Sequence, residues 1–177
     1  MGKTGFPAKA KLFFAILYSD EAVFTQALKD VTEKFGKMDE ESSSFRFDLT
    51  DYYEEEMGAG LEKKIVTAEK LIDKSILAEI KLYTNSVEEK YQGEGGSRRI
   101  NIDPGYITAS KLVLATTKNY QQRIYLRDGI FAEISLNFKK GRVEFNPWTY
   151  PDYKLKTTTD FFLKVRNEYM KSLRRDS

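Results

Sequence analysis

The longest apolar run of this chain occupies residues 12–18 and reads Leu-Phe-Phe-Ala-Ile-Leu-Tyr. A strand with one solvated face alternates apolar and polar residues, so a strand-length run without alternation is typical of a central strand covered on both faces. The run is also far too short to cross a bilayer as a helix. Any fold for this chain must therefore supply packing partners for both faces of this strand.

The residues after this run predict a helix and then a second strand. Ser19 or Asp20 offers an N-cap, and apolar residues follow at helical spacing until Gly36. Apolar and polar residues then alternate across residues 44–48, which is typical of a half-buried strand.

A third strand, a second helix and a fourth strand follow. The strand at 63–68 is the weakest of these predictions, because its composition is polar for a central position. Asp73 caps a helix that must end before the glycine-rich residues 93–97. Residues 99–103 alternate again before Pro104-Gly105 breaks the strand, and the resulting order, βαββαβ, is the ferredoxin-like one.

The last third of the chain predicts a different arrangement. Residues 107–117 fit either a short helix or an apolar strand, because their apolar residues have no clear period, and we expect the helix. A three-stranded antiparallel meander follows. A C-terminal helix then begins at a capping box formed by Thr157 and Asp160.

The turns of the meander set its register. A three-residue loop at 127–129 places Leu126 opposite Ile130 and Ile124 opposite Ala132. A two-residue turn at 140–141 places Phe138 opposite Val143. This register predicts one buried side of the middle strand. That side consists of Ile130, Ala132, Ile134, Leu136 and Phe138.

These elements predict a single α+β domain over residues 1–177. A ferredoxin-like βαββαβ core covers residues 1–105, and a helix, a three-stranded antiparallel meander and a C-terminal helix cover residues 106–177. If the meander continues the first sheet, the protein has one large sheet. If it forms a second sheet, a cleft lies between two layers.

Residue types that the sequence lacks exclude several functional classes. No cysteine is present, which excludes a disulfide scaffold, thiol catalysis and thiolate metal sites. No histidine is present either, which removes the commonest metal ligand and the usual neutral-pH proton carrier. The net charge is only +2, unlike that of a dedicated DNA-binding protein. We expect a soluble protein of the bacterial cytoplasm without a membrane partner.

The densest run of carboxylates, residues 48–58, follows directly on a predicted strand end. Asp51, Glu54 and Glu55 are candidate ligand-binding residues there, because Mg²⁺ is held by one or two carboxylates while water and a substrate phosphate complete its shell. A solvated acidic turn explains the same run. We therefore assign no metal ligand, and Mg²⁺ is the only cofactor considered.

Polar residues at the next predicted strand ends extend the candidate site. Asp103 either accepts a hydroxyl group of a ligand or simply holds the Pro-Gly turn. Lys111, Lys118 and Arg123 place cations near the hydroxyls of residues 116–117, an arrangement that suits an anion.

An aromatic segment at residues 146–153 holds the single tryptophan of the chain. Trp148 and Tyr150 are candidate pocket walls, because large aromatic side chains with a polar group suit ligand surfaces. The alternative is that the segment is a strap that packs over the core between the meander and the last helix.

Several runs together resemble a bacterial family known as domain of unknown function 4416. They are residues 12–19, 47–58, 101–106, 111–118, 123–133 and 147–153. The resemblance covers essentially the whole chain and implies no established activity. Some members carry the label "GTP-binding protein". This chain has no complete phosphate loop and no Asn-Lys-x-Asp run, and residues 103–105 are one residue too short for an Asp-x-x-Gly switch, so we do not adopt that label.

The sequence favours a domain that binds a small-molecule or nucleotide-like ligand, with or without Mg²⁺. The alternative is a non-catalytic interaction module that forms a homodimer or a hetero-complex through a sheet face or edge. RNA binding is a weaker alternative, because no run matches an RNA-binding signature, and a nucleic-acid partner is not expected. Whether the protein is an enzyme stays open; without histidine, a carboxylate would have to act as general base.

Overall fold

The computed structural model describes residues 2–48 and 54–175. Within them, nine strands form one antiparallel sheet in the order β2-β4-β1-β5-β6-β8-β7, with β3 also beside β4 and β9 beside β8. The strands are β1 (Ala10–Tyr18), β2 (Met38–Glu41), β3 (Phe45–Arg46), β4 (Glu62–Ile72), β5 (Ile100–Ile107), β6 (Lys111–Thr116), β7 (Ile124–Arg127), β8 (Ile130–Lys139) and β9 (Arg142–Phe145). The pairing of β6 with both β5 and β8 makes one large sheet, so the described residues form no second sheet.

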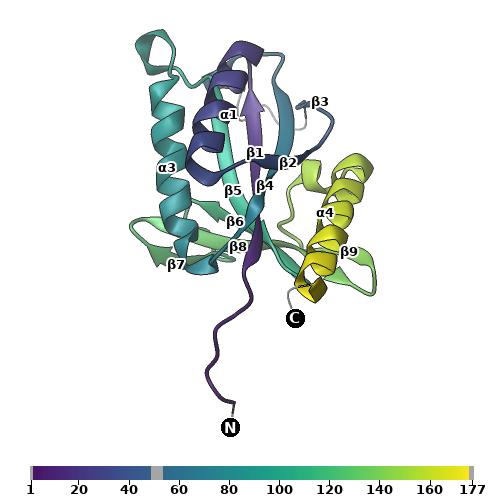
Figure 1. Cartoon of the computed structure of the whole chain (residues 1–177). Helices are drawn as coiled ribbons and strands as arrows, with labels where there is room; N and C mark the ends of the chain where they lie inside the picture. Colours follow the sequence, from purple (N-terminus) through teal and green to yellow (C-terminus); the bar gives the residue numbers. More distant parts are fainter. Residues whose placement is uncertain (1, 49–53, 176–177) are drawn as a thin grey trace.

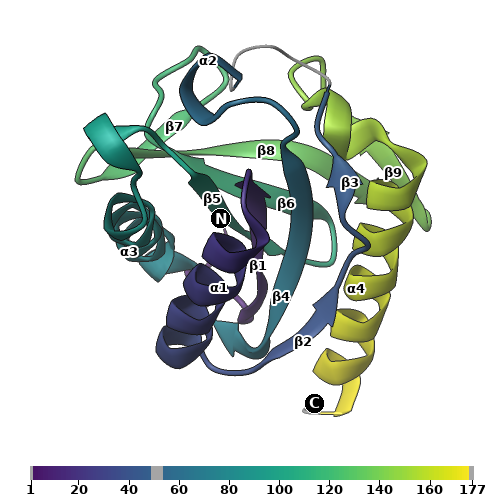
Figure 2. The same ribbon diagram turned by 90° about the horizontal axis from the view of Figure 1, so that it is seen from above.

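The helices cover both faces of this sheet. They are α1 (Glu21–Phe35), α2 (Glu54–Met57), α3 (Leu77–Lys90) and α4 (Lys156–Arg175), with 3₁₀ turns η2 (Lys74–Ile76), η3 (Glu94–Gly96) and η4 (Pro151–Lys154). Figures 1 and 2 show α1 and α3 side by side on one face and α4 on the other. No helix in the described ranges is both long and apolar enough to cross a membrane.

Strand β1 is the central strand that its apolar run predicts. All nine of its residues are buried, and β4 and β5 pair with its two edges. Leu12, Phe14 and Ile16 pack in the core beneath α1 and α3, whereas Phe13 and Ala15 pack in the core beneath α4. Both faces therefore need apolar side chains, which explains the absence of alternation.

Both predicted N-cap residues, Asp20 and Asp73, accept a hydrogen bond from the backbone. Asp20 caps α1 by accepting a hydrogen bond from Ala22 N at 2.8 Å, and Gly36 follows the last turn. Asp73 caps η2, which leads into α3, by accepting from Ser75 N at 2.8 Å. The predicted cap of α1 is therefore confirmed, whereas Asp73 caps the turn before α3 and the N-cap of α3 itself, Ile76, makes no side-chain hydrogen bond.

The outer edge of β4 is shared by two short strands instead of one. The strand expected at 44–48 is only two residues long, and β2 precedes it on the same edge. β2 reads Met-Asp-Glu-Glu, a charged composition that protects an edge strand from further pairing but conceals it in the sequence.

The helix expected at residues 107–117 is wrong, because this segment ends β5 and then forms β6. Leu112 and Leu114 face the core beneath α4, whereas Val113 and Ala115 face the core beneath α3. Both faces of β6 are buried, so its residues are apolar without alternation. A buried strand of this kind has the same appearance in sequence as a buried helix.

Strand β5 also continues through Pro104-Gly105, where we expected a break. A Cβ atom on Gly105 would lie 2.4 Å from Phe13 Cζ and 2.4 Å from Val113 O. Glycine is therefore required here because the neighbouring strands approach closely, and not because the chain turns.

The predictions for the two turns between β7, β8 and β9 differ in their success. The two-residue turn at Lys140-Gly141 is confirmed by the pairing of Phe138 with Val143. The three-residue loop predicted at 127–129 is wrong, because Arg127 pairs directly with Ile130 across a two-residue turn, but the pairing of Ile124 with Ala132 given by the same prediction is confirmed.

The residues of that turn explain the difference. Asp128 and Gly129 have φ angles of 52° and 78°, which suit the type I′ turn of a tight hairpin. A bulge between Tyr125 and Arg127 absorbs the resulting shift of register.

A bulge at Ser135 of β8 overturns the expected single buried side. The register shifts there, between Val113 opposite Ile134 and Leu112 opposite Leu136. Residues on the two sides of the bulge therefore face different cores. Ile130, Ala132 and Ile134 pack beneath α3, whereas Leu136 and Phe138 pack beneath α4.

The C-terminal helix is present, but its expected capping box is wrong. α4 begins at Lys156, one residue before the proposed cap Thr157. The Asp160 carboxylate accepts a hydrogen bond from Lys156 Nζ at 2.5 Å instead. An exposed ion pair one turn apart thus stands where the sequence predicts a cap.

Candidate functional site

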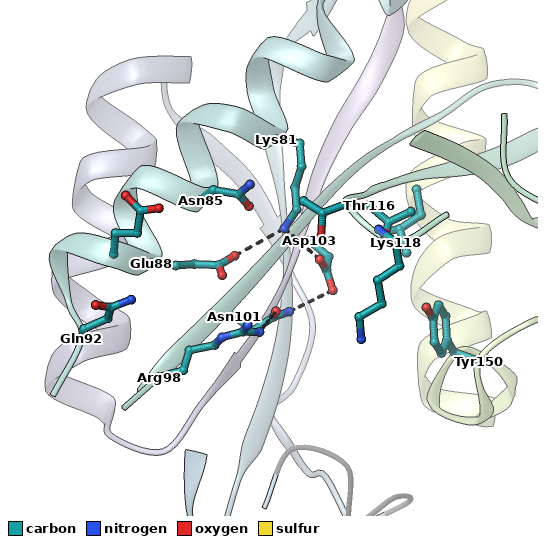
Figure 3. Close-up of a pocket in the computed structure, with 13 residues that line it drawn as sticks. Lys81, Asn85, Glu88, Gln92, Arg98, Asn101, Asp103, Thr116, Lys118 and Tyr150 are labelled. Atoms are coloured by element: carbon teal, nitrogen blue, oxygen red, sulfur yellow. Dashed lines mark hydrogen bonds and ion pairs between the residues drawn. The ribbon is translucent and has the colours of Figure 1, made fainter. Parts of the chain in front are cut away.

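A pocket of about 250 Å³ opens where β5 and β6 part (Figure 3). The two strands pair over three residues, from Gly105 opposite Leu114 to Ile107 opposite Leu112. Pro104 comes next on β5 and has no N–H to donate to β6, so the ladder ends at this residue. We call the resulting gap the fork pocket.

The lining of the fork pocket is almost entirely polar. Of its thirteen residues, all except Leu114 carry a polar side chain. They are Lys81, Asn85, Glu88, Glu89, Gln92, Arg98, Asn101, Asp103, Leu114, Thr116, Thr117, Lys118 and Tyr150. They come from α3 and the connection that follows it, from β5, from β6 and the two residues after it, and from the segment before η4.

Two side chains of α3 take the place of a neighbouring strand for the backbone of β5. Lys81 Nζ donates to Ile102 O at 2.9 Å, and Ile102 N donates to Glu88 Oε1 at 2.8 Å. These backbone groups would otherwise lack a partner, which is costly in a buried strand. Side chains of α3 therefore supply the hydrogen bonds that the backbone of Ile102 would otherwise form with a neighbouring strand.

Lys81 also joins the two carboxylates of the pocket floor. Its Nζ lies 3.0 Å from Asp103 Oδ1 and 3.4 Å from Glu88 Oε1, as the dashed lines of Figure 3 show. Burial acts against the charge of Lys81, but the two carboxylates outweigh it and raise its pKa. Lys81 is therefore a fixed cation whose three N–H bonds are all used.

The two carboxylates differ in their titration. Burial opposes the ionised form of Asp103, but Lys81 and Lys63 outweigh it, so the pKa of Asp103 lies below its usual value. Burial raises the pKa of Glu88, and Lys81 offsets only part of that effect. A pair of acids with opposite shifts in one pocket is a known property of functional sites.

A second series of polar contacts links Asp103 to Asn101, Arg98 and Glu56 on another side of the pocket. Asn101 Nδ2 donates to Asp103 Oδ2 at 2.9 Å, and Arg98 Nη1 donates to Asn101 Oδ1 at 3.0 Å. Arg98 Nη2 also lies 3.2 Å from Glu56 Oε1 of α2. The arginine is therefore paired outside the pocket, and it orients the amide that holds Asp103.

Arg123 lies behind the opposite wall and organises it. Its side chain is 1% exposed and pairs with Glu133, which is 0% exposed, at 2.6 Å from Nε to Oε2. Nη1 donates to Thr116 Oγ1 at 3.3 Å and to Lys118 O at 3.0 Å, and Nη2 donates to Tyr150 Oη at 2.8 Å. One buried guanidinium thus holds three residues of the lining.

Tyr150 provides a hydroxyl donor to the pocket. Burial raises the pKa of Tyr150 to about 12, so the phenol stays protonated at neutral pH. Its oxygen accepts from Arg123, so its hydrogen is available to an acceptor in the pocket.

The structure brings together some of the residues that the sequence predicts. Asp103, Lys118 and Tyr150 line the fork pocket, and Arg123 contacts two of them from behind. Asp103 does not hold a turn, since it lies within β5.

Two other predicted residues lie outside the pocket. Lys111 pairs with Asn137 at the far end of β6. Trp148 is 40% exposed and donates from Nε1 to Ile134 O at 2.9 Å, so it fastens its segment to β8 and does not line the pocket.

The candidate side chains of the acidic run, 48–58, lie outside the described residues. Asp51 and the side chains of Glu54 and Glu55 lie outside the described residues. The backbone of Glu54 and Glu55 belongs to α2, whose Glu56 reaches Arg98 of the lining. Among the residues whose side chains are described, no group of three or more carboxylates is positioned to hold a metal ion.

Sequence reasoning missed the central lysine and glutamate of the pocket. Lys81, Thr84 and Glu88 are spaced three and four residues apart, which places them on one face of α3. Such a polar line is typical of a solvated helix face. The position of α3 in the fold turns this face toward β5. The spacing alone therefore fits both a solvated face and a pocket lining.

Comparison with known proteins identifies the family. No curated protein and no solved structure matches the chain. The model of the family described as Domain of unknown function (DUF4416) matches residues 8–169, a range that includes every residue of the fork pocket. The chain therefore belongs to this family, as its sequence runs predict.

Proposed function

We propose that the protein binds a small, hydrophilic organic molecule in the fork pocket. The observation that carries this proposal is the lining itself, in which twelve of thirteen residues are polar and converge from four separate parts of the chain. Polar groups assembled at such a cost in desolvation are useful when a ligand replaces the lost water.

The same lining favours a small metabolite over a nucleotide. Base recognition relies on aromatic or apolar surfaces for stacking, and Leu114 and Tyr150 are the apolar and aromatic members of the lining. Ionised Asp103 supplies an acceptor, Tyr150 and the two threonines supply hydroxyls, and Lys118 supplies a positive charge. A molecule that carries several hydroxyl or charged groups fits this set.

A catalytic role would divide between the two carboxylates. Glu88, whose pKa is raised by burial, is the better suited of the two to exchange a proton, whereas Asp103, whose pKa is lowered by Lys81, stays ionised and stabilises positive charge. Mg²⁺ assistance would use one or two of these oxygens together with the ligand's own.

The test is a thermal-shift screen of the purified chain, because a ligand that binds the native state raises its apparent stability. The panel contains polyols, amino acids, amino sugars, phosphosugars, hydroxycarboxylates and nucleotides, each with and without Mg²⁺. We expect a shift for one class of small polar compound. The shift should disappear in Lys118→Met and persist in the matched control Lys111→Met, which alters the far end of β6. No shift for any compound would contradict the proposal.

We also propose that residues 1–105 form a ferredoxin-like core and that residues 106–177 extend it within a single domain by β6, by two successive hairpins of β7, β8 and β9 in which β7 and β9 share one edge of β8, and by α4. The strand order β2-β4-β1-β5, with α1 and α3 in the two connections, supports this classification. Limited proteolysis tests the single domain: we expect no stable fragment that ends near residue 105. A protected fragment of that length would contradict it.

A homodimer through the outer edge of β7 is the second candidate. Ile124 is 71% exposed and Tyr125 is 59% exposed on a strand whose outer edge has no neighbour in the described sheet. Antiparallel pairing of β7 with a second copy satisfies both edges by two-fold symmetry. Sedimentation at high concentration should then detect a dimer that Ile124→Lys dissociates, and a wild-type protein that stays monomeric would contradict this candidate.

A further inference from the structure

The floor of the fork pocket holds more negative than positive charge. Lys81 is one cation, and it contacts two carboxylates, Glu88 and Asp103. The Glu88 side chain is 12% exposed and the Asp103 side chain is 25% exposed, so their net charge is only partly solvated. The three side chains together therefore leave about one uncompensated negative charge.

The nearest other cations do not cancel this charge. Lys63, which acts on Asp103 electrostatically, lies 2.5 Å from the buried carboxylate of Asp152. Arg98, which acts on Glu88, is paired with Glu56. Each of these cations brings a carboxylate of its own, and the other two charged residues of the lining, Lys118 and Glu89, add one charge of each sign, so the enlarged group keeps its negative excess.

One oxygen atom of the floor is unused and accessible. Both hydrogen bonds of the Glu88 carboxylate go to Oε1, so Oε2 has no hydrogen-bond partner among the described residues. Oε2 is not among the fully buried atoms that lack a partner, although the Glu88 side chain is only 12% exposed. The free oxygen therefore has access to the pocket space.

Resting on the proposed function, we infer that the ligand carries a protonated amine that lies against Glu88 Oε2 and Asp103. An ammonium group supplies the missing positive charge and donates up to three hydrogen bonds to acceptors that are already fixed. The opposite wall, with Tyr150, Thr116 and Lys118, takes the oxygen atoms of the same molecule. The expected ligand class is thus a small primary amine that also bears hydroxyl or carboxylate groups, such as an amino acid or an amino sugar.

Matched pairs of compounds test the amine directly by isothermal titration at neutral pH. Each amino acid is compared with the hydroxy acid of the same skeleton, and each amino sugar with its parent sugar. We expect one amine to bind at least about tenfold more tightly than its hydroxyl counterpart, the size of a charge-assisted hydrogen bond. The two series distinguish the two sources of the amine. The N-acetylated form of the bound amine, which lacks the charge, should not bind.

Variants of α3 assign the effect to the proposed carboxylate. Glu88→Gln should weaken binding of the amine about 10- to 100-fold and leave the hydroxyl counterpart unchanged. Glu79→Gln, which alters an exposed carboxylate of the same helix, should bind like the wild type. Circular dichroism and unfolding curves verify that both variants fold, and the acetylated compound tests the inference without any variant.

The outcomes separate this inference from the proposed function. If a hydroxyl compound binds as tightly as its amine, or if only compounds without an amine bind, the inference fails while the pocket remains a ligand site. If no compound of the whole panel binds, both fail.

Discussion

Arg123 shows how one buried side chain shapes a pocket that it does not itself line. It uses its planar group of donors to fix Thr116, Lys118 and Tyr150 while Glu133 balances its charge. Lysine has no such fork of donors, so the position is specific for arginine. The wall of the pocket is thus set by a residue that the sequence predicts as a ligand contact but that acts as a positioning residue.

Removal of this arginine should be costly for stability. Arg123→Met leaves the fully buried carboxylate of Glu133 without its partner, which typically destabilises a protein by about 3–5 kcal/mol. Denaturant unfolding measures the loss. The double variant Arg123→Met/Glu133→Leu should recover most of it, because no charge is then left unpaired. A double variant as unstable as the single one would show that the loss comes from packing instead.

Gly105 offers a second residue-scale test. In Gly105→Ala the new methyl group meets the ring of Phe13 and the carbonyl oxygen of Val113, and the carbonyl belongs to a paired strand that cannot easily move. We expect a loss of about 1–3 kcal/mol in unfolding free energy. Gly5→Ala, at a site with no atom within 4 Å of the added group, should have no measurable effect.

The elements around the fork depend on one another. β5 is held by β1 on one edge, but on the other edge it is held first by β6 and then by side chains of α3. A helix therefore completes a strand ladder where Pro104 prevents a second strand from doing so. The pocket forms where side chains of α3 replace β6 as the hydrogen-bond partners of β5.

Hydrogen exchange tests this substitution of a helix for a strand. The amide of Ile102, which donates to Glu88, should be protected in the wild type and should exchange at least about tenfold faster in Glu88→Ala. The amide of Phe14 in β1 should keep its wild-type rate in both proteins. Equal protection of Ile102 with and without the Glu88 side chain would mean that another group satisfies this amide.

Sequence patterns predicted the elements whose environment is simple. β1, with two covered faces, and α1, with an N-cap and an apolar stripe, can be recognised from local spacing. β6 cannot, because a short strand buried on both sides has no period that separates it from a helix. The type I′ turn at Asp128-Gly129 also escaped prediction, because the bulge that accompanies it has no sequence signal of its own.

At the scale of the whole molecule, the candidate site was only partly predictable. Residues at strand ends, such as Asp103 and Lys118, could be proposed because strand ends carry loops and sites. Lys81 and Glu88 could not, since their role depends on how α3 lies across the sheet. The sequence specifies this placement through the whole fold, and no local motif records it.

The opposite pKa shifts of the two floor carboxylates should appear in the pH dependence of global unfolding. Burial raises the pKa of Glu88 above 4.5, so the contribution of Glu88 to stability is present at acid pH and is lost as pH rises through the folded-state value. Burial opposes the ionised form of Asp103, but Lys81 outweighs burial and lowers the pKa of Asp103 below 3.8. The contribution of Asp103 to stability is therefore present above pH 3.8 and is lost as pH falls through the folded-state pKa.

Urea unfolding across pH measures these two contributions. Relative to the wild type, Glu88→Gln should gain stability as pH rises above about 4.5, whereas Asp103→Asn should lose stability as pH rises toward about 3.8. Differences from the wild type that do not change with pH would contradict both assignments.

The position of β1 in the sheet has a consequence for synthesis of the chain. β1 is made early, yet both of its neighbours come much later, and its pairing with β5 requires residues up to Ile107. At a ribosomal rate of about 5–20 residues per second, the apolar strand emerges roughly 5–20 s before its last partner. During that interval at least one edge of the apolar residues 12–18 lacks its partner strand, and an exposed segment of this kind is what chaperones bind.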